Sequence, residues 1–292
     1  MCGICGFTGY RQDQKTVIER MMKAIEHRGP DSEGSFCREK ITLGFRRLSI
    51  IDLEDGQQPM ESADGNLHIV FNGEIYDYKE LRAELETFGI SFCTHSDTEV
   101  LVNTLQQYGE KALDKLRGMF GFAVWNEKEQ TLMLARDFFG IKPVYYAEID
   151  GHFVFASEIK SILAFPGYER KVNQKALEQY LSFQYAPLEE TFFKGIYKLM
   201  PGHMLLYKNG NYEIKTYFKT KLTPGKWNRK TNMDQLRSQL AEILKDSVKH
   251  HMLSDVEVGA FLSGGVDSGY LASASGADQA FTVGFDEGDR YS

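Results

Sequence analysis

The first three residues, Met1-Cys2-Gly3, place a thiol at the second position of the chain. Removal of Met1 is expected when the second residue is small, and it leaves Cys2 with both a thiol and a free α-amine. The amine titrates at roughly 7.7–8.0 and the thiol at roughly 8.5, so the amine can act as the base that activates the thiol beside it, directly or through a water. The alternative is a buried structural cysteine, because free cysteines are often buried. These residues alone support the two interpretations equally.

The segment SGGVDS at residues 263–268 is the second stretch that could do chemistry, and it lies between an expected strand and an expected helix. Its glycines allow backbone N–H groups to turn towards an anion, which the start of the helix also favours. The chain has no Gly-Lys-Ser/Thr sequence, so this is not a Walker A loop. A plain glycine turn is the alternative, but the context favours an anion loop suited to a pyrophosphate group.

Composition narrows the class of protein. The net charge of −7 argues against general nucleic-acid binding, which needs a basic surface. We expect no membrane span and no secretory signal, because the chain has neither a long uncharged apolar run nor a basic segment before an apolar one. The sparse cysteines favour free thiols in a reducing cytoplasm, and the single Cys-x-x-Cys disfavours zinc; the four are Cys2, Cys5, Cys37 and Cys93.

The elements that must position these residues fall into two regions. In the first region, apolar spacing and turn residues predict helices over 15–28, 78–88, 158–164 and 174–182, and a further helix that begins at a Ser96–Glu99 capping box. Strands are predicted over 3–10, 41–51, 67–72, 203–207 and 212–218, with four short β-rich runs between 118 and 156 that form an antiparallel series. This mixture predicts an α+β domain.

Residues 219–232 are basic, nearly free of apolar side chains, and contain Pro-Gly, so they are the best linker candidate. A helix, a strand over 256–262, the SGGVDS loop, a short helix and a strand over 280–285 follow. This β–loop–α–β order predicts the opening of a parallel α/β sheet. The expected domains are therefore residues 1–218 and 233–292, joined by the linker.

Six motifs occur along the chain in a fixed order: Cys2-Gly3-Ile4-x-Gly6, His27-Arg28-Gly29-Pro30-Asp31, Arg47-Leu48-Ser49-Ile50-Ile51-Asp52, Asn72-Gly73-Glu74-Ile75-Tyr76, Ser96-Asp97-Thr98-Glu99 and Arg136-Asp137-x-x-Gly140. Together they resemble the class II, or N-terminal-nucleophile, glutamine amidotransferases. With SGGVDS added, the chain resembles the glutamine-hydrolysing asparagine synthetases. The resemblance runs from residue 2 to the end of the sequence.

The resemblance implies an αββα sandwich in which Cys2 attacks the side-chain amide of glutamine. A γ-glutamyl thioester then forms, ammonia leaves, and water releases glutamate. The attack creates an oxyanion, and Asn72 (side-chain amide) and Gly73 (backbone N–H) match the family's oxyanion hole. Losing one such donor typically costs about 2.7–4 kcal/mol. Glycine at position 73 also lets the backbone approach the substrate closely.

The resemblance also assigns the far end of glutamine. Arg47 suits the carboxylate through a bidentate fork, Glu74 and Asp97 suit the ammonium, and the backbone at Ile50 and Ile51 adds contacts. From the residues alone, Arg47 could instead be a solvated strand residue, and Asp97 could be a first-turn helix residue favoured by the dipole. Cys5 is expected to be a buried structural thiol. His27-Arg28, Asp137 and Lys142 are interpreted as supporting structure.

For the second region the resemblance implies ATP and Mg²⁺, with a pyrophosphatase-type (PP-loop) nucleotide-binding domain. Aspartate attacks the α-phosphate to give β-aspartyl-AMP and pyrophosphate, and ammonia then displaces AMP to give asparagine. Asp267 is the sole candidate metal ligand. The residues that match the family's ATP site are Leu262, Ser263, Gly264, Gly265, Val266, Asp267, Ser268 and Val283.

The sequence departs from the family at Ser292, because the family continues through a longer synthetase domain that carries the aspartate-binding residues. We therefore expect these 292 residues alone to hydrolyse glutamine without making asparagine, and residues past about 250 to be loosely held. Three alternatives stay open: another class II amidotransferase, a related amide-forming enzyme such as a β-lactam synthetase, and a non-catalytic glutamine-binding regulatory fragment. The expected partners are small-molecule substrates, and the sequence leaves a homodimer open.

Overall fold

The structure is a computed structural model that describes residues 1–52, 55–221 and 232–284. The chain divides into two compact units, Met1–Thr220 and Lys221–Ser292, and each is described by itself. Most of the expected linker, residues 219–232, lies outside the described residues. None of the helices in the described ranges is long and apolar enough to cross a membrane.

Unit 1 contains two six-stranded antiparallel sheets. The first has the order β10-β8-β9-β1-β3-β2, with bounds β10 (Ile196–Lys198), β8 (Tyr145–Ile149), β9 (His152–Ala156), β1 (Gly3–Thr8), β3 (Ile41–Arg47) and β2 (Ser32–Cys37). The second has the order β12-β11-β7-β6-β5-β4, with bounds β12 (Asn211–Thr216), β11 (His203–Lys208), β7 (Thr131–Arg136), β6 (Gly118–Asn126), β5 (Leu67–Ile75) and β4 (Met60–Glu61).

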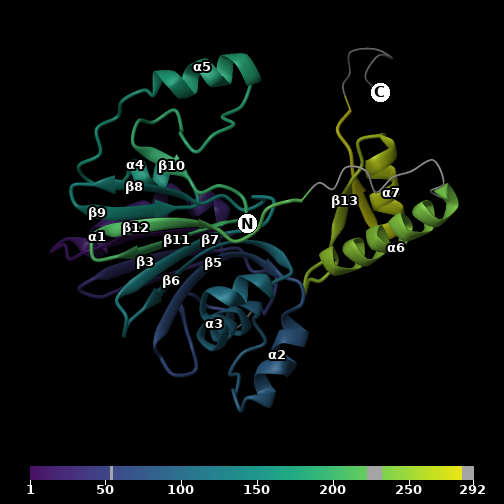
Figure 1. The fold of residues 1–292 in the computed structure, drawn as a ribbon, viewed down its shortest axis with the longest axis horizontal. Helices are drawn as coiled ribbons and strands as arrows, with labels where there is room; N and C mark the ends of the chain where they lie inside the picture. The colour runs from purple at the N-terminus through teal and green to yellow at the C-terminus, as the bar shows by residue number, and fades with distance from the viewer. Residues whose placement is uncertain (53–54, 222–231, 285–292) are drawn as a thin grey trace. The chain divides into compact units, whose positions relative to one another are not determined.

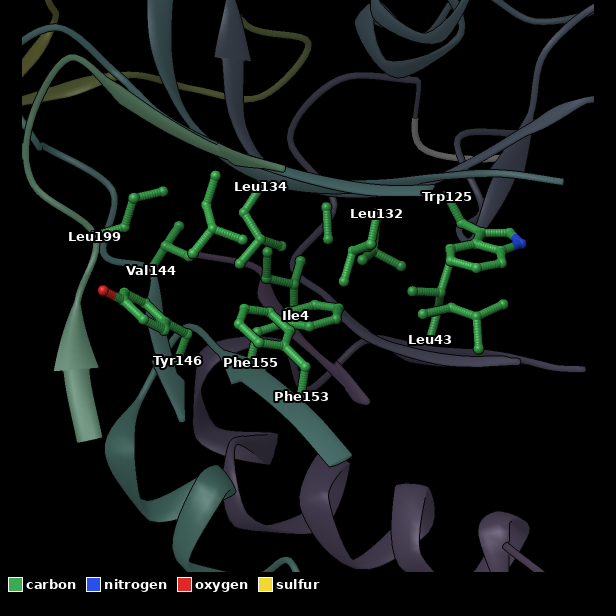
Figure 2. Packing of buried hydrophobic residues seen from close by; sticks show 14 of the residues in the cluster. Ile4, Leu43, Trp125, Leu132, Leu134, Val144, Tyr146, Phe153, Phe155 and Leu199 are labelled. Carbon is green, nitrogen blue, oxygen red and sulfur yellow. The ribbon is translucent and has the colours of Figure 1, made fainter. Parts of the chain in front are cut away.

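The main hydrophobic core lies between these two sheets. Figure 2 shows Ile4, Leu43 and Phe155 from the first sheet packed towards Leu132 and Leu134 from the second. Side chains of this kind remove apolar surface from water at roughly 25 cal/mol per Å², the largest favourable contribution to folding. Burial between the sheets therefore fixes how the two sheets face each other.

Helices cover the outer faces of both sheets (Figure 1). The helices α1 (Gln14–Ala24) and α4 (Ile159–Leu163) bury Ile18 and Ile162 against Phe7 of the first sheet. A Cβ at Gly44 would lie 2.7 Å from Cδ1 of Ile18, so glycine allows α1 to sit close to β3. The helices α2 (Tyr78–Thr87) and α3 (Asp97–Tyr108) pack on the side of the second sheet, where α3 contacts both β5 and α2. The expected αββα sandwich is confirmed.

The remaining helical elements of unit 1 are short connections and one longer helix. They are the 3₁₀ turns η1 (Glu26–Arg28) and η2 (Gly109–Asp114), and the helix α5 (Gln174–Phe183). The turn η1 follows α1 after the single residue Ile25, so the predicted helix over 15–28 is divided into a helix and a 3₁₀ turn.

Two local expectations are wrong. The β-rich runs over 118–156 do not form one antiparallel series, because β6 and β7 pair in the second sheet whereas β8 and β9 pair in the first. The capping box is incomplete as well. Ser96 accepts a hydrogen bond from the Thr98 N–H, but the Glu99 carboxylate binds the N–H groups of Cys93 and Thr94 rather than that of Ser96.

The described part of unit 2 contains α6 (Met233–His251), β13 (Gly259–Phe261), α7 (Val266–Ser275) and β14 (Gln279–Phe281). The strands β13 and β14 pair in parallel, with Phe261 opposite Phe281. This is the β–loop–α–β unit that the sequence predicts, although both strands are shorter than expected. Phe261 keeps 88% of its surface exposed, so the two strands bury little apolar area by themselves.

Candidate active site

A cavity in unit 1 gathers the amino terminus, the end of β3 and the end of β5. The residues that the resemblance assigns to glutamine chemistry line this cavity, with the exception of Asp97. The lining residues are Met1, Cys2, Arg47, Leu48, Ile50, Ile51, Gly56, Phe71, Asn72, Gly73, Glu74, Ser96, Thr98 and Lys142. Residues far apart in the sequence therefore meet at one place.

Cys2 is held beside β3 by backbone contacts. Its Sγ lies 3.4 Å from the Leu48 N and 3.5 Å from the Leu48 O. The Arg28 Nε donates a hydrogen bond of 2.9 Å to the Cys2 carbonyl, and the Arg28 Nη1 pairs with Glu158 at 2.9 Å. Burial raises the pKa of the Cys2 thiol, whereas the Leu48 N–H, the chain's amino group and Arg47 act in the opposite direction.

Met1 occupies part of the cavity in the unprocessed chain. Its Sδ accepts a hydrogen bond of 3.4 Å from the Lys142 Nζ. Burial lowers the pKa of the Met1 α-amine, and the Arg28 and Lys142 cations lower it further. An amino group at this place is therefore biased towards its neutral, basic form.

The side-chain amide of Asn72 is a buried hydrogen-bond donor without an acceptor in the described part of the chain. Its side chain is 1% exposed, and its Nδ2 has no hydrogen-bond partner among the described residues. Leaving a buried donor unsatisfied costs about 1–3 kcal/mol, which a bound oxygen would recover. The wall of the cavity thus holds an amide N–H group ready for an acceptor.

Gly73 follows Asn72 on β5 and pairs with Phe120 on β6. A Cβ at Gly73 would lie 2.1 Å from the carbonyl oxygen of Met119. The neighbouring strand thus excludes any side chain here. Close approach to a substrate is the reason that the sequence offers for this glycine, and the structure adds a reason within the sheet.

Arg47 is 4% exposed, and its Nη2 donates to the carbonyl oxygens of Ile51, at 3.3 Å, and of Asp52. A Cβ at Gly56 would lie 2.5 Å from the same nitrogen. The guanidinium therefore supports the loop that carries Ile50 and Ile51. Its neighbour Arg46 points the other way and donates to the Gly29 carbonyl at 3.0 Å. The alternative of a solvated Arg47 is wrong.

The two candidate carboxylates differ in their surroundings. Glu74 lines the cavity, whereas Asp97 is 5% exposed and lies behind its neighbours Ser96 and Thr98. The Asp97 Oδ2 accepts a hydrogen bond of 3.0 Å from the Ile75 N–H. Burial raises the pKa of Asp97 to about 7, and the nearby Glu74 charge also raises it.

Asp137 organises the loop that brings Lys142 to the cavity. Its Oδ1 accepts from the N–H groups of Phe139 and Ile141, and its Oδ2 accepts from the Lys142 N–H at 2.9 Å. The structural interpretation of Asp137 is thus supported. Sequence reasoning missed that the Lys142 side chain, which is 5% exposed, lines the site. The sequence feature that could have indicated this position is the turn Asp137-x-x-Gly140, which ends two residues before Lys142.

The other cysteines lie away from this chemistry. Cys5 is fully buried on β1, and burial raises its pKa to about 12, as a structural thiol requires. Neither it, Cys37 nor Cys93 lines the cavity. Within residues 1–52, 55–221 and 232–284, no group of three or more His, Cys, Asp or Glu side chains could hold a metal ion.

The SGGVDS loop in unit 2 connects β13 to α7 and is open around Gly264. Gly264 has φ +80°, and a Cβ there would meet nothing within 4 Å. The Oγ atoms of Ser263 and Ser268 lie 2.9 Å apart, and Ser268 also donates to the Gly265 carbonyl at 3.1 Å. Gly265 is the N-cap of α7, so the loop leads directly into the first turn of the helix.

Two further residues assigned to ATP lie at the same edge of the parallel pair. The Leu262 N–H donates to the Phe281 carbonyl at 2.8 Å, which marks the carboxyl end of β13. Val283 comes just after β14 and is 80% exposed. Carboxyl ends of parallel strands form the usual ligand-binding edge of such sheets.

Two sheets packed face to face between helices, with a cysteine at the start of a central strand, define the N-terminal-nucleophile class of amidohydrolase folds. Solved structures with this fold support the class. The chain superimposes with a TM-score of 0.59 on the allosteric regulatory enzyme of purine biosynthesis, covering 99% of this chain and 67% of that one at 17% identity. It also superimposes on glutamine phosphoribosylpyrophosphate amidotransferase from B. subtilis with a TM-score of 0.56, covering 99% and 68% at 18% identity.

The chain belongs to the glutamine amidotransferase domain family, whose model matches residues 1–218. Residues 239–292 match the asparagine synthase family. Asparagine synthetase [glutamine-hydrolyzing] 1 of Bacillus subtilis (strain 168) is 44% identical over 97% of this chain and 46% of its own length. The chain spans about half the length of the curated relatives it matches.

Proposed function

We propose that unit 1 is a glutaminase in which Cys2, once Met1 is removed, attacks the side-chain amide of glutamine. The observation that carries this proposal is the buried Asn72 Nδ2, which lacks a partner among the described residues and belongs to a residue that lines the same cavity as Cys2. An amide carbonyl provides the acceptor that this nitrogen lacks. When the carbonyl becomes an oxyanion, the hydrogen bond strengthens, and this differential stabilisation accelerates the reaction.

The proton transfers follow from Cys2 being the first residue of the processed chain. Its α-amine takes the thiol proton as the sulfur–carbon bond forms, and Asn72 with the Gly73 N–H holds the oxyanion. When the carbon–nitrogen bond breaks, the amine returns that proton to the leaving group, which departs as ammonia. Water then attacks the γ-glutamyl thioester, releases glutamate and restores the thiol.

The opposite side of the cavity is proposed to recognise the amino-acid end of glutamine. Arg47 binds the carboxylate, together with backbone groups at Ile50 and Ile51. Glu74 and Asp97 favour the ammonium. Asp97 would act from behind the wall, since it is buried and accepts a hydrogen bond from the Ile75 N–H. Its charge in a dry site is felt more strongly than it would be in water.

For the whole protein we propose glutamine-dependent synthesis of asparagine, with residues 1–218 as the amidotransferase domain, 219–232 as a linker and 233–292 as the start of the synthetase domain. The printed names of the relatives and the two matched families support this proposal. Aspartate, activated by ATP as β-aspartyl-AMP, would accept the ammonia. We further propose a cytoplasmic location, in keeping with the free cysteines.

The residues of unit 2 fit a nucleotide phosphate. The open space at Gly264 and the N-cap at Gly265 allow a phosphate group to reach backbone N–H groups without a clash. The SGGVDS loop, residues 263–268, would hold the pyrophosphate portion, and Leu262 and Val283 would lie towards the adenine nucleotide. When bound, Mg²⁺ would neutralise phosphate charge, and Asp267 is the candidate ligand.

The test is ammonia release from glutamine by the purified chain, with Cys2→Ala and Asn72→Ala measured beside it. We expect turnover by the wild type, none by Cys2→Ala, and a loss of roughly 100–1,000-fold in Asn72→Ala. Mass spectrometry of the amino terminus establishes first that Met1 is gone. Equal background rates in all three proteins would instead favour a non-catalytic glutamine-binding fragment.

Asparagine formation is measured separately with ATP, aspartate and glutamine. We expect the 292 residues to release ammonia without forming asparagine. Clear asparagine formation would overturn that expectation. A product formed from another acceptor would favour one of the other amide-forming enzymes.

A further inference from the structure

The cavity contains a buried cation that the proposed reaction does not use. Lys142 is 5% exposed and lines the cavity with Cys2. Its Nζ donates to the Met1 Sδ at 3.4 Å, and this is its one hydrogen bond among the described residues. A thioether is a weak acceptor, and a buried ammonium without strong partners is costly. Removing Met1 takes even this partner away.

Charged groups surround Lys142 on several sides. Burial lowers its pKa, as does Arg28, while Glu74, Asp137 and the Cys2 thiolate favour the charged form. The amino terminus faces Cys2, Arg28, Lys142 and Asp31, and the Cys2 thiol also faces Arg47 and Asp97.

Arg28 and Arg47, the other cations of the site, already bind carbonyl oxygens. Arg28 holds the carbonyl of Cys2, and Arg47 holds the carbonyls of Ile51 and Asp52. Lys142 donates to no carbonyl or carboxylate oxygen among the described residues. Arg28 also acts on the amine, and Arg47 on the thiol, through their charges. They differ from Lys142 in that both are tied to carbonyl oxygens, whereas the Lys142 ammonium is not tied to one in the described part of the chain.

We propose that Lys142 is a positioning residue of the glutaminase: once Met1 is removed, its ammonium faces the Cys2 amine and thiol and favours their reactive, deprotonated forms. The inference rests on the proposed function of unit 1. Lys142 keeps its own proton throughout. The thiol proton still passes to the amine and then to the departing ammonia, so the reaction needs no additional reactant.

The physical reason is the burial of the nucleophile. Burial raises the pKa of the Cys2 thiol, which makes the thiolate scarce at neutral pH. A nearby positive charge stabilises the thiolate and disfavours protonation of the amine. In a site with an effective dielectric near 20, one charge a few ångströms away shifts each equilibrium by about one pH unit or more.

The experiment compares Lys142→Met, Lys142→Arg and a control, Lys198→Met. Lys198 is another lysine whose pKa burial lowers, but its Nζ donates to the Ala186 carbonyl at 2.9 Å and it does not line the cavity. Two profiles are measured against pH: kcat/KM for ammonia release, and the rate of Cys2 alkylation by iodoacetamide. Mass spectrometry confirms equal removal of Met1 in every protein.

We expect Lys142→Met to move the acidic limb of both profiles to higher pH by about one unit, so that kcat/KM falls about tenfold at pH 7 and recovers in more alkaline buffer. Lys142→Arg keeps the charge and should stay near the wild-type limb, as should Lys198→Met. Unchanged limbs in Lys142→Met would overturn the proposal. An equal loss at every pH in both Lys142 variants would also overturn it, because it would indicate a purely structural residue.

The two profiles separate this inference from the proposed function. If the wild type releases no ammonia, the glutaminase proposal fails, yet the alkylation profiles still report whether Lys142 acts on the thiol. If the wild type is active and the limbs do not move, only the proposed action of Lys142 fails.

Discussion

At the scale of single residues, Asp97 is a buried carboxyl group whose ionisation near neutral pH destabilises the folded chain. The carboxyl group is buried, and burial raises its pKa to about 7 from an ordinary value near 3.9. Between these two pH values the folded chain keeps a proton that the unfolded chain has lost. The unfolded state then binds fewer protons, so the free energy of unfolding falls as pH rises from about 4 to about 7.

We therefore predict that Asp97→Asn flattens this dependence on pH. The wild type should lose on the order of 4 kcal/mol of stability across that window relative to Asp97→Asn, since each pKa unit corresponds to about 1.4 kcal/mol. The measurement is urea unfolding of both proteins at several pH values. Parallel curves for the two proteins would show that Asp97 titrates normally.

In the wild type, glutamine should stabilise the folded chain more strongly above pH 7, because its ammonium would pair with the ionised Asp97 carboxylate.

At the scale of elements, the loop between β7 and β8 matters because it passes from the second sheet to the first. Asp137 fixes its path by accepting backbone N–H groups of Phe139, Ile141 and Lys142, and it is 1% exposed. Hydrogen bonds to a charged acceptor contribute about 1.5–3 kcal/mol each. The Arg136 guanidinium also holds this loop by donating to the carbonyl oxygens of Lys142 and Gly140, but Asp137 binds more of its backbone N–H groups than any other side chain.

We predict that Asp137→Ala destabilises unit 1 by about 3–5 kcal/mol and lowers kcat/KM for ammonia release by releasing Lys142 from its place. Asp137→Asn, which keeps one acceptor oxygen, should lose less of both. Thermal unfolding and ammonia release measure the two effects. Wild-type stability in Asp137→Ala would show that other contacts of the loop suffice to hold it.

The sequence predicts most elements of unit 1, because apolar spacing and turn residues act locally, but it misses the edge strands β2, β4 and β10. It does not predict which sheet each strand joins. β7 and β9 are buried along nearly their whole length, so they show no alternation to tell one face from the other, and the crossing after Asp137 depends on a buried carboxylate. Motif resemblance identifies Cys2 and Asn72. Lys142 escapes it because its place follows from that loop.

At the scale of the whole molecule, the two units differ in how completely they bury their apolar residues. Unit 1 has cores on both faces of its first sheet, whereas unit 2 exposes Phe261 and Phe281 on a two-stranded sheet. The matched glutamine amidotransferase domain, residues 1–218, falls within unit 1. Each catalytic group proposed for glutamine hydrolysis also comes from unit 1.

We therefore predict that a fragment of residues 1–220 folds and releases ammonia from glutamine with the same kcat/KM as the 292-residue chain, within about twofold. Its main thermal transition should lie within a few degrees of that of the longer chain, because buried apolar area and hydrogen bonds within unit 1 set the temperature. Calorimetry and the ammonia assay on both proteins make the comparison, with Cys2→Ala in each as the blank. A fragment that folds but loses activity would show that unit 2 contributes to the glutamine site, and the division of labour proposed for the two units would then fail.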